Sequence, residues 1–108
     1  MSKYPDKILL YRGVDKEEAD IVKKTGEISK SKRYRGVSHW TTSPDRANKY
    51  ADYAVLCIEV EVDKKGSKIT GASPTYPELK NKDFRKIGGN DYAYLGASLK
   101  KEIKIIYK

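Results

Sequence analysis

The stretch SHWTTSPDRANKYA, residues 38–51, joins a predicted strand to a predicted helix and decides how the fold is organised. Ser38–Thr42 is suited to a short strand. Ser43 is a typical helix cap, and Pro44 fits the first helical turn, where its missing N–H costs nothing. The helix that follows buries a stripe of small residues at helical spacing: Ala47, Tyr50, Ala51 and Ala54.

An earlier strand and helix are predicted on the N-terminal side of this stretch. Ile8–Val14 has the pattern of a strand, and Asp15 is then placed as an N-cap. Glu18 follows three residues later, in the position of a capping box. A helix is therefore expected from about Lys16 to Thr25, and Gly26 is a natural C-terminal stop.

The C-terminal side is predicted to consist mostly of strands. Ala54–Val62 is a strand whose continuously apolar first half indicates a central position in a sheet. The remaining predicted segments are a turn at Asp63–Gly66, a short strand at Lys68–Thr70, a loop over Gly71–Gly89, and closing strands at Asp91–Leu95 and Glu102–Tyr107. This order, with the helices first and most strands after them, predicts an α+β domain.

The composition predicts a single small domain. The chain has 108 residues, of which 35% are charged and 38% apolar, and its apolar runs argue against disorder. No segment approaches the length of a membrane span and no signal peptide is visible, so we expect a cytoplasmic protein with no membrane partner. One cysteine, Cys57, and one histidine, His39, exclude an intrachain disulfide and a Cys/His zinc cluster.

The net charge of +8 favours a polyanion or an acidic protein surface as partner. The segment Lys30–Arg35 concentrates this charge. A solvated loop is the simpler interpretation of this segment, because Tyr34 is the only aromatic residue among its cations.

Arg12 does not fit a purely apolar core. It lies in phase with Ile8 and Leu10, so the strand alternation turns its side chain inward. A buried guanidinium needs an anion, a carboxylate or several acceptors, and Gly13 would let a ligand approach the backbone. If the strand instead ends at Tyr11, Arg12 simply reaches water. The strand pattern alone favours neither interpretation.

Three consecutive hydroxyl residues, Thr41, Thr42 and Ser43, follow His39 and Trp40. They are either ordinary strand residues and a helix cap or the wall of a pocket for a small polar molecule. His39 could act as a base, but no nucleophile or carboxylate adjacent in sequence forms a dyad with it. A lone histidine near a strand is more often a hydrogen-bonded structural residue.

Glu102 begins the last predicted strand, in the sequence KKEIKIIYK of residues 100–108. Ile103 and Ile105 mark the buried face of that strand. A glutamate flanked by lysines is usually a surface residue, and Glu102 gains significance only if its strand lies beside those of Arg12 and Thr41–Ser43.

Taken together, these three positions resemble the ADP-ribosyltransferase family in its Arg-Ser-Glu form. The segments LYRG, HWTTSPDRANKYA and KKEIKIIYK carry the likeness. The resemblance implies a fold of two short sheets that form a cleft for NAD, preceded by two N-terminal helices. The order of the motifs extends over nearly the whole chain, whereas Gly66–Gly89 contributes nothing to it.

The resemblance also implies a role for each residue. Arg12 would contact the phosphates or ribose of NAD, to which a guanidinium fork is suited. Thr41, Thr42 and Ser43 would shape the pocket near the nicotinamide ribose, and Glu102 would be the catalytic glutamate that stabilises positive charge as nicotinamide leaves. The expected NAD-binding residues are completed by Gly13, His39, and Tyr50 or Tyr53, either of which would stack on nicotinamide or pack in the core.

The chain departs from the family where arginine-modifying members carry Glu-x-Glu, because Lys100 replaces the first glutamate. We therefore expect a mono-ADP-ribosyltransferase whose acceptor is a protein side chain, a nucleic acid or water, and by fold analogy a phage-encoded effector. The alternative is a non-catalytic basic module that binds a nucleic acid, a nucleotide or an acidic protein.

Overall fold

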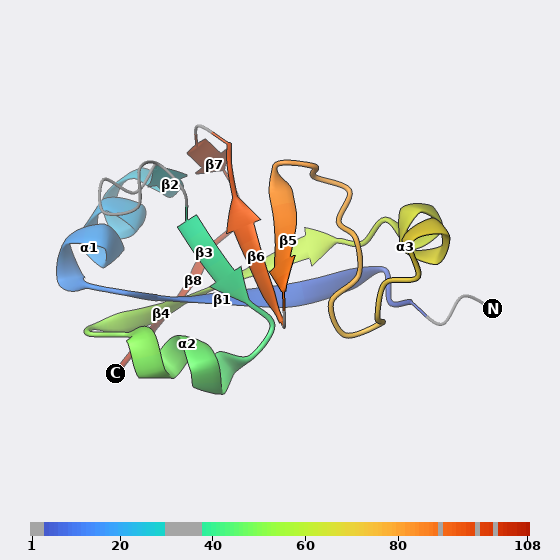
Figure 1. Cartoon of the computed structure of the whole chain (residues 1–108). Helices are drawn as coiled ribbons and strands as arrows, with labels where there is room; N and C mark the ends of the chain where they lie inside the picture. The colour runs from blue at the N-terminus through green and yellow to red at the C-terminus, as the bar shows by residue number, and fades with distance from the viewer. Residues whose placement is uncertain (1–3, 30–37, 89, 97, 101) are drawn as a thin grey trace.

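The computed structural model describes residues 4–29, 38–88, 90–96, 98–100 and 102–108. Within them the chain forms an antiparallel sheet with three helices, as expected of an α+β fold (Figure 1). In chain order the elements are β1 (Lys7–Val14), α1 (Lys16–Thr25), β2 (Glu27–Ser29), β3 (Ser38–Thr41), α2 (Pro44–Tyr50), β4 (Ala54–Glu61), α3 (Lys64–Thr70), β5 (Phe84–Gly88), β6 (Asp91–Tyr94), β7 (Ser98–Lys100) and β8 (Lys104–Tyr107).

The main sheet has six strands in the order β5-β6-β3-β1-β4-β8, and β2 and β7 pair separately. β1 and β4 are paired along their whole length, in eight residue pairs from Lys7↔Glu61 to Val14↔Ala54. By contrast, β1 and β3 share a single pair in register, Tyr11↔Thr41. The centre of the sheet is therefore narrowly joined between β1 and β3.

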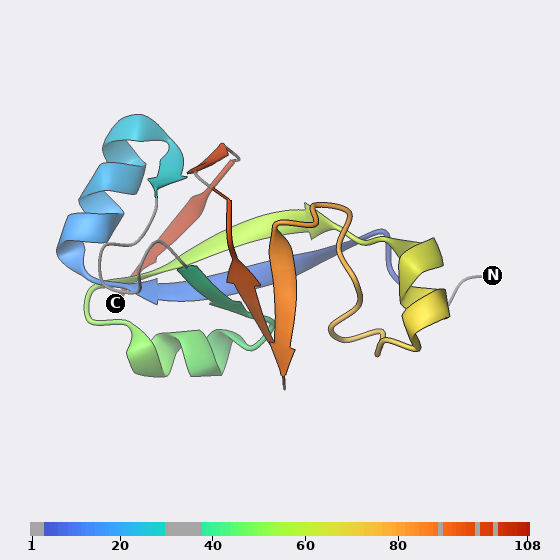
Figure 2. The ribbon, with the colours of Figure 1, turned by 45° about the horizontal axis from the view of Figure 1, so that its top comes forward.

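Two helices pack on opposite faces of β1 and β4 (Figure 2). α1 begins and ends where its capping residues predict: the side chain of Asp15 accepts from the amide of Glu18, and Gly26 has a left-handed φ of 71°. Ala19 and Val22 of α1 are buried in the main core. The sequence-based prediction of this helix is confirmed at both ends.

α2 also begins where the sequence predicts, since Ser43 Oγ accepts a hydrogen bond from the amide of Arg46 at 3.2 Å. Its buried stripe is shorter than expected. Ala47 and Ala51 are buried, but Ala54 already belongs to β4. The helix covers the face of the sheet opposite to the main core.

The main core lies on the α1 side of the sheet. Its largest fully buried side chains include Trp40, Tyr92, Leu10, Ile28, Leu56, Ile58 and Leu79. Trp40 donates its indole N–H to Ser38 Oγ at 3.0 Å, which satisfies its one polar group inside the core. The central position predicted for β4 is confirmed, because it lies between β1 and β8 and is buried from Ala54 to Ile58.

The turn and short strand predicted over residues 63–70 are wrong, because the segment Lys64–Thr70 is helix α3. The Asp63 carboxylate accepts from the amide of Gly66 at 2.9 Å, and Gly71 ends the helix with a φ of 69°. Asp and Gly favour both turns and helix ends, so a turn pattern does not distinguish the two.

The strand β5 was expected to be part of a loop. It pairs with β6 from Phe84↔Tyr94 onward, with an irregularity between Lys86 and Gly88. Phe84 is buried and its ring lies 4.7 Å from that of Tyr94. This tertiary contact, which local pattern does not report, stabilises the strand at the sheet edge.

Candidate functional site

Arg12 points inward, which is one of the two interpretations that the strand pattern left open, and Glu18 of α1 holds its side chain. Its side chain is only 8% exposed, and its Nε and Nη2 donate to both carboxylate oxygens of Glu18 at 3.0–3.2 Å. Glu18 thus serves as the carboxylate partner that a buried guanidinium requires. The capping-box role expected of the Glu18 side chain is replaced by this ion pair.

Arg12 also spans the narrow join between β1 and β3. Its Nη1 donates to the backbone carbonyl of His39 at 3.2 Å. The guanidinium therefore connects three elements: β1, α1 and β3. Each of its three nitrogens donates within the protein, so Arg12 has a structural role at this point.

Two of the three hydroxyl side chains, those of Thr41 and Ser43, accept hydrogen bonds from nearby backbone amides. Thr41 is buried, and its Oγ1 accepts from the amide of Ser43 at 3.1 Å. Ser43 Oγ caps α2. The backbone of Thr42 donates to the carbonyl of Asn90 at 2.9 Å, and its side chain is half-buried. The triplet therefore anchors the strand–helix junction and also ties it to the start of β6.

An acidic residue that the sequence analysis did not select lies directly beside this triplet. Asp91, the first residue of β6, pairs in register with Thr41. Its Oδ2 forms an ion pair with Nη2 of Arg46 at 3.1 Å, and the Asp91 side chain is 21% exposed. Its Oδ1 is buried and has no hydrogen-bond partner within the described parts of the chain. A buried carboxylate oxygen in this state lacks the donor that would offset its burial.

Two exposed rings, His39 and Tyr50, belong to the elements that flank Asp91, β3 and α2. His39 is exposed on β3, in register with Ala93 and two residues from Thr41. Tyr50 is 70% exposed and lies four residues after Arg46 on α2, so both project from the same side of that helix. Together with Thr41 and Asp91 these side chains form what we call the strand-end site.

The space over Gly13 is filled by α2 and is not open to a ligand. A methyl group placed on Gly13 would lie 2.3 Å from the carbonyl oxygen of Ala47 and 2.6 Å from the amide nitrogen of Ala51. Gly13 therefore permits the close approach of a helix, and the ligand-approach role inferred from the sequence is corrected.

Glu102 lies away from both Arg12 and the hydroxyl triplet. The register places Thr41, Tyr11, Cys57 and Lys104 in one row across the sheet. Three strand spacings therefore separate Thr41 from Lys104, about 15 Å. Glu102 precedes Lys104 by two residues, so it lies still further along the chain, and it is exposed.

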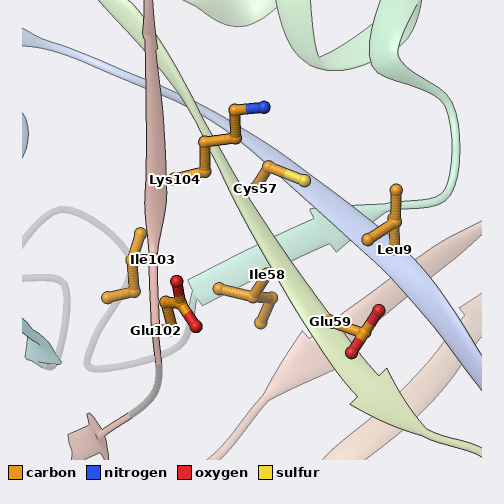
Figure 3. A pocket seen from close by; sticks show the side chains of 7 residues that line it. All are labelled: Leu9, Cys57, Ile58, Glu59, Glu102, Ile103 and Lys104. Carbon is orange, nitrogen blue, oxygen red and sulfur yellow. The ribbon is translucent and has the colours of Figure 1, made fainter.

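Arg12 and Glu102 also lie on different faces of the sheet. The Arg12 side chain points to the α1 face, whereas Glu102 lines an open hollow of about 850 Å³ with Leu9, Cys57 and Lys104 (Figure 3). Burial raises the pKa of the Cys57 thiol, a change that Lys104 opposes. The expected meeting of Arg12, the hydroxyl triplet and Glu102 around one surface is not what the structure forms.

Tyr53 lies at the start of β4, away from the strand-end site. Its ring makes an edge-to-face contact with that of Tyr107, with centroids 5.6 Å apart, and it packs against the main core. Of the two tyrosines proposed to stack on nicotinamide, Tyr50 is the one on α2, the helix whose Arg46 pairs with Asp91. The basic segment Lys30–Arg35 lies outside the described residues.

Asp91 could have been recognised from a weak signal. It follows Gly88-Gly89-Asn90, a typical turn sequence, and begins a predicted strand. Asp91 and Glu102 are both acids at the start of a predicted strand. Only the pairing of β3 with β6 shows that Asp91 is the one beside Thr41.

Comparison with known proteins adds no assignment. No family model, no curated protein and no solved structure matches the chain. Across the portions of the chain that the structure describes, no helix is both long and apolar enough to cross a membrane.

Proposed function

We propose that the protein is a mono-ADP-ribosyltransferase that moves ADP-ribose from NAD to a protein or nucleic-acid acceptor and releases nicotinamide. The observation that carries this proposal is the register pair Thr41↔Asp91, which joins an acid to the hydroxyl triplet next to β1. The acid is Asp91, in place of the Glu102 that sequence resemblance selects.

The sheet topology places the proposed site at a join between two groups of strands. Because β1 and β3 share one registered pair while β1 and β4 share eight, the sheet behaves as two three-stranded halves, β5-β6-β3 and β1-β4-β8. The two halves meet at Tyr11 and Thr41. A substrate bound at this join would contact both halves, as in the two-sheet fold that the resemblance implies.

The chemistry assigned to Asp91 follows from its environment. Its buried Oδ1 accepts a hydrogen bond from a ribose hydroxyl, and the fixed negative charge stabilises the ribosyl cation character that develops as the bond to nicotinamide breaks. The electrons of that bond leave with nicotinamide. An acceptor nucleophile then forms the new bond to the same ribose carbon and gives up its proton to water.

The neighbouring side chains have complementary roles. The exposed ring of Tyr50 is suited to stack on nicotinamide. The Arg46 guanidinium is half-exposed and keeps donors beyond its contact with Asp91, so it fits the diphosphate role that resemblance assigns to Arg12. His39 and Thr42 line the rim. Thr41 fixes the strand end.

The test is transfer of label from NAD, with cell lysate as the source of acceptor. Asp91→Asn keeps the size and removes the charge, and we expect it to abolish both label transfer and nicotinamide release. Glu102→Gln is the matched control and should retain activity near that of the unmodified protein. Loss of transfer in Glu102→Gln with full activity in Asp91→Asn would contradict the assignment of the acid.

A second function is favoured by the engagement of Arg12 with Glu18 and His39, which removes one cation from any NAD site. The protein would then be a non-catalytic module that binds an acidic protein, a nucleic acid or a nucleotide through its positive charge. Binding of NAD without release of nicotinamide in the same assay identifies this case.

A further inference from the structure

No strand among the residues that the structure describes pairs with the outer edge of β8, and its sequence KKEIKIIYK is not used by the strand-end site. β8 is the last strand of the six-stranded sheet, and within the described residues its strand partner is β4. An open edge presents a row of N–H and C=O groups that another strand can pair with.

The hydrogen bonds to β4 show which groups face outward. The amide of Lys108 donates to the carbonyl of Tyr53 at 3.1 Å, and Ile106 is in register with Val55. In an antiparallel strand, the N–H and C=O of one residue point to the same neighbouring strand, and those of the next residue point to the opposite side. Lys104, Ile106 and Lys108 therefore bond to β4, and the N–H and C=O of Ile105 and Tyr107 point to the outer edge.

The side chains along this edge leave apolar area exposed. Ile106 is 46% exposed and Tyr107 is 50% exposed. No proline interrupts Lys104–Tyr107, and Lys104 is the one charged residue in this segment, although prolines and charges commonly protect edge strands.

From these features we infer that β8 pairs antiparallel with β8 of a second copy of this chain, about a two-fold axis at Ile105. This is an interaction surface and is separate from the proposed transferase activity. The two-fold places Ile105 opposite its own symmetry mate, with outward-facing N–H and C=O groups on both strands. The result is one sheet that continues across both copies.

This register is self-complementary in apolar contacts. Antiparallel pairing about Ile105 puts Ile103 opposite Tyr107 of the second copy, and Lys104 opposite Ile106 of the second copy. Ile103, Ile105 and Tyr107 share one face of the strand, since side chains alternate. Cross-strand pairs of aromatic and β-branched residues are the contacts that stabilise antiparallel strands.

The register is also complementary in charge. It puts Glu102 opposite Lys108 of the second copy, twice per dimer, and no like charges face each other directly. Lys108 Nζ already donates to the carbonyls of Ala51 at 2.8 Å and Asn48 at 3.3 Å. An ammonium has three donors, so one remains for the incoming carboxylate.

The alternative register about Ile106 would place Lys104 opposite Lys108 of the second copy. Like charges directly opposite each other destabilise a strand pair. Charge therefore selects the register about Ile105 and gives Glu102 a role at the interface.

The experiment measures association of the full chain by sedimentation velocity between about 10 μM and about 1 mM, a range suited to a weak dimer. We expect a reversible shift from one copy to two. Ile105→Pro removes an outward N–H and leaves the bonds to β4 intact, because proline is tolerated where the N–H faces solvent. It should weaken the dimer by roughly tenfold or more.

A charge-swap series keeps the proposal falsifiable if Ile105→Pro does not fold. Glu102→Lys and Lys108→Glu should each weaken the dimer, and the double variant should restore it. Circular dichroism verifies that each variant is folded. A chain that stays monomeric throughout the concentration range, or a double variant no better than the single variants, would overturn the proposal.

Discussion

Thr41 of β3 and Asp91 of β6 are paired directly across the two strands, and Thr41 is at the same time the one residue of β3 in register with β1, through Tyr11. The acid, the hydroxyl and the join between the two halves of the sheet therefore occupy one row. This row is the basis for locating the candidate site at the strand end and not at Glu102.

The ion pair between Arg12 and Glu18 should stabilise the fold. Glu18→Ala leaves a guanidinium that is buried without its carboxylate partner. We expect a loss of about 3 kcal/mol in the free energy of unfolding, measured by urea denaturation. Glu17→Ala, at an exposed position of the same helix, should stay within about 0.5 kcal/mol of the unmodified protein. Equal effects of the two substitutions would show that Arg12 does not depend on Glu18.

Gly13→Ala should displace α2, since the added methyl would lie within 2.3–2.8 Å of backbone atoms of Ala47, Ala51 and Tyr50. Overpacking against backbone costs about 2 kcal/mol, which chemical denaturation would measure. Gly71→Ala is the comparison: it has open space but a φ of 69°, so we expect about 1 kcal/mol. A neutral Gly13→Ala would mean that the helix does not pack as described.

Alkaline pH should destabilise the protein through Tyr92. Burial is the main cause that raises the pKa of Tyr92 above its ordinary value, and Glu78 and Tyr76 add to it. The unfolded chain ionises this phenol near pH 10, whereas the folded chain keeps it neutral. The free energy of unfolding therefore keeps its full value below about pH 10 and falls as the pH rises above it.

Tyr92→Phe tests this dependence. The Tyr92 hydroxyl donates to the carbonyl of Pro77, so its removal should cost about 1–2 kcal/mol at neutral pH. The variant should also lose stability less steeply in alkali, as followed by denaturation at a series of pH values. Tyr50→Phe, at a ring that is 70% exposed, should leave the pH profile unchanged. An unaltered slope in Tyr92→Phe would exclude Tyr92 as the source.

Local sequence signals predicted the elements whose boundaries depend on capping. Asp15, Gly26 and Ser43 each act as the cap that their residue type favours, so α1 and α2 begin as expected. The strand pattern left the direction of Arg12 open between the core and water, and its burial shows that the inward interpretation is correct.

The partners of these residues could not be predicted in the same way, because they depend on contacts that are distant in sequence or in space. Glu18 was assigned to a cap by its spacing, yet its carboxylate turns to Arg12. Asp91 and Glu102 are alike in pattern, and the pairing of β6 with β3 alone distinguishes them. β5 depends on the contact of Phe84 with Tyr94, which no local period reveals.

The most direct test of the strand-end site is an NAD titration followed by the backbone amide resonances of ¹⁵N-labelled protein, up to about 1 mM NAD. We predict the largest shifts at Thr41, Thr42, Tyr50 and Asp91, and their loss in Asp91→Asn. No shifts at these amides, or shifts centred on Leu9, Cys57 and Glu102, would contradict the proposed site.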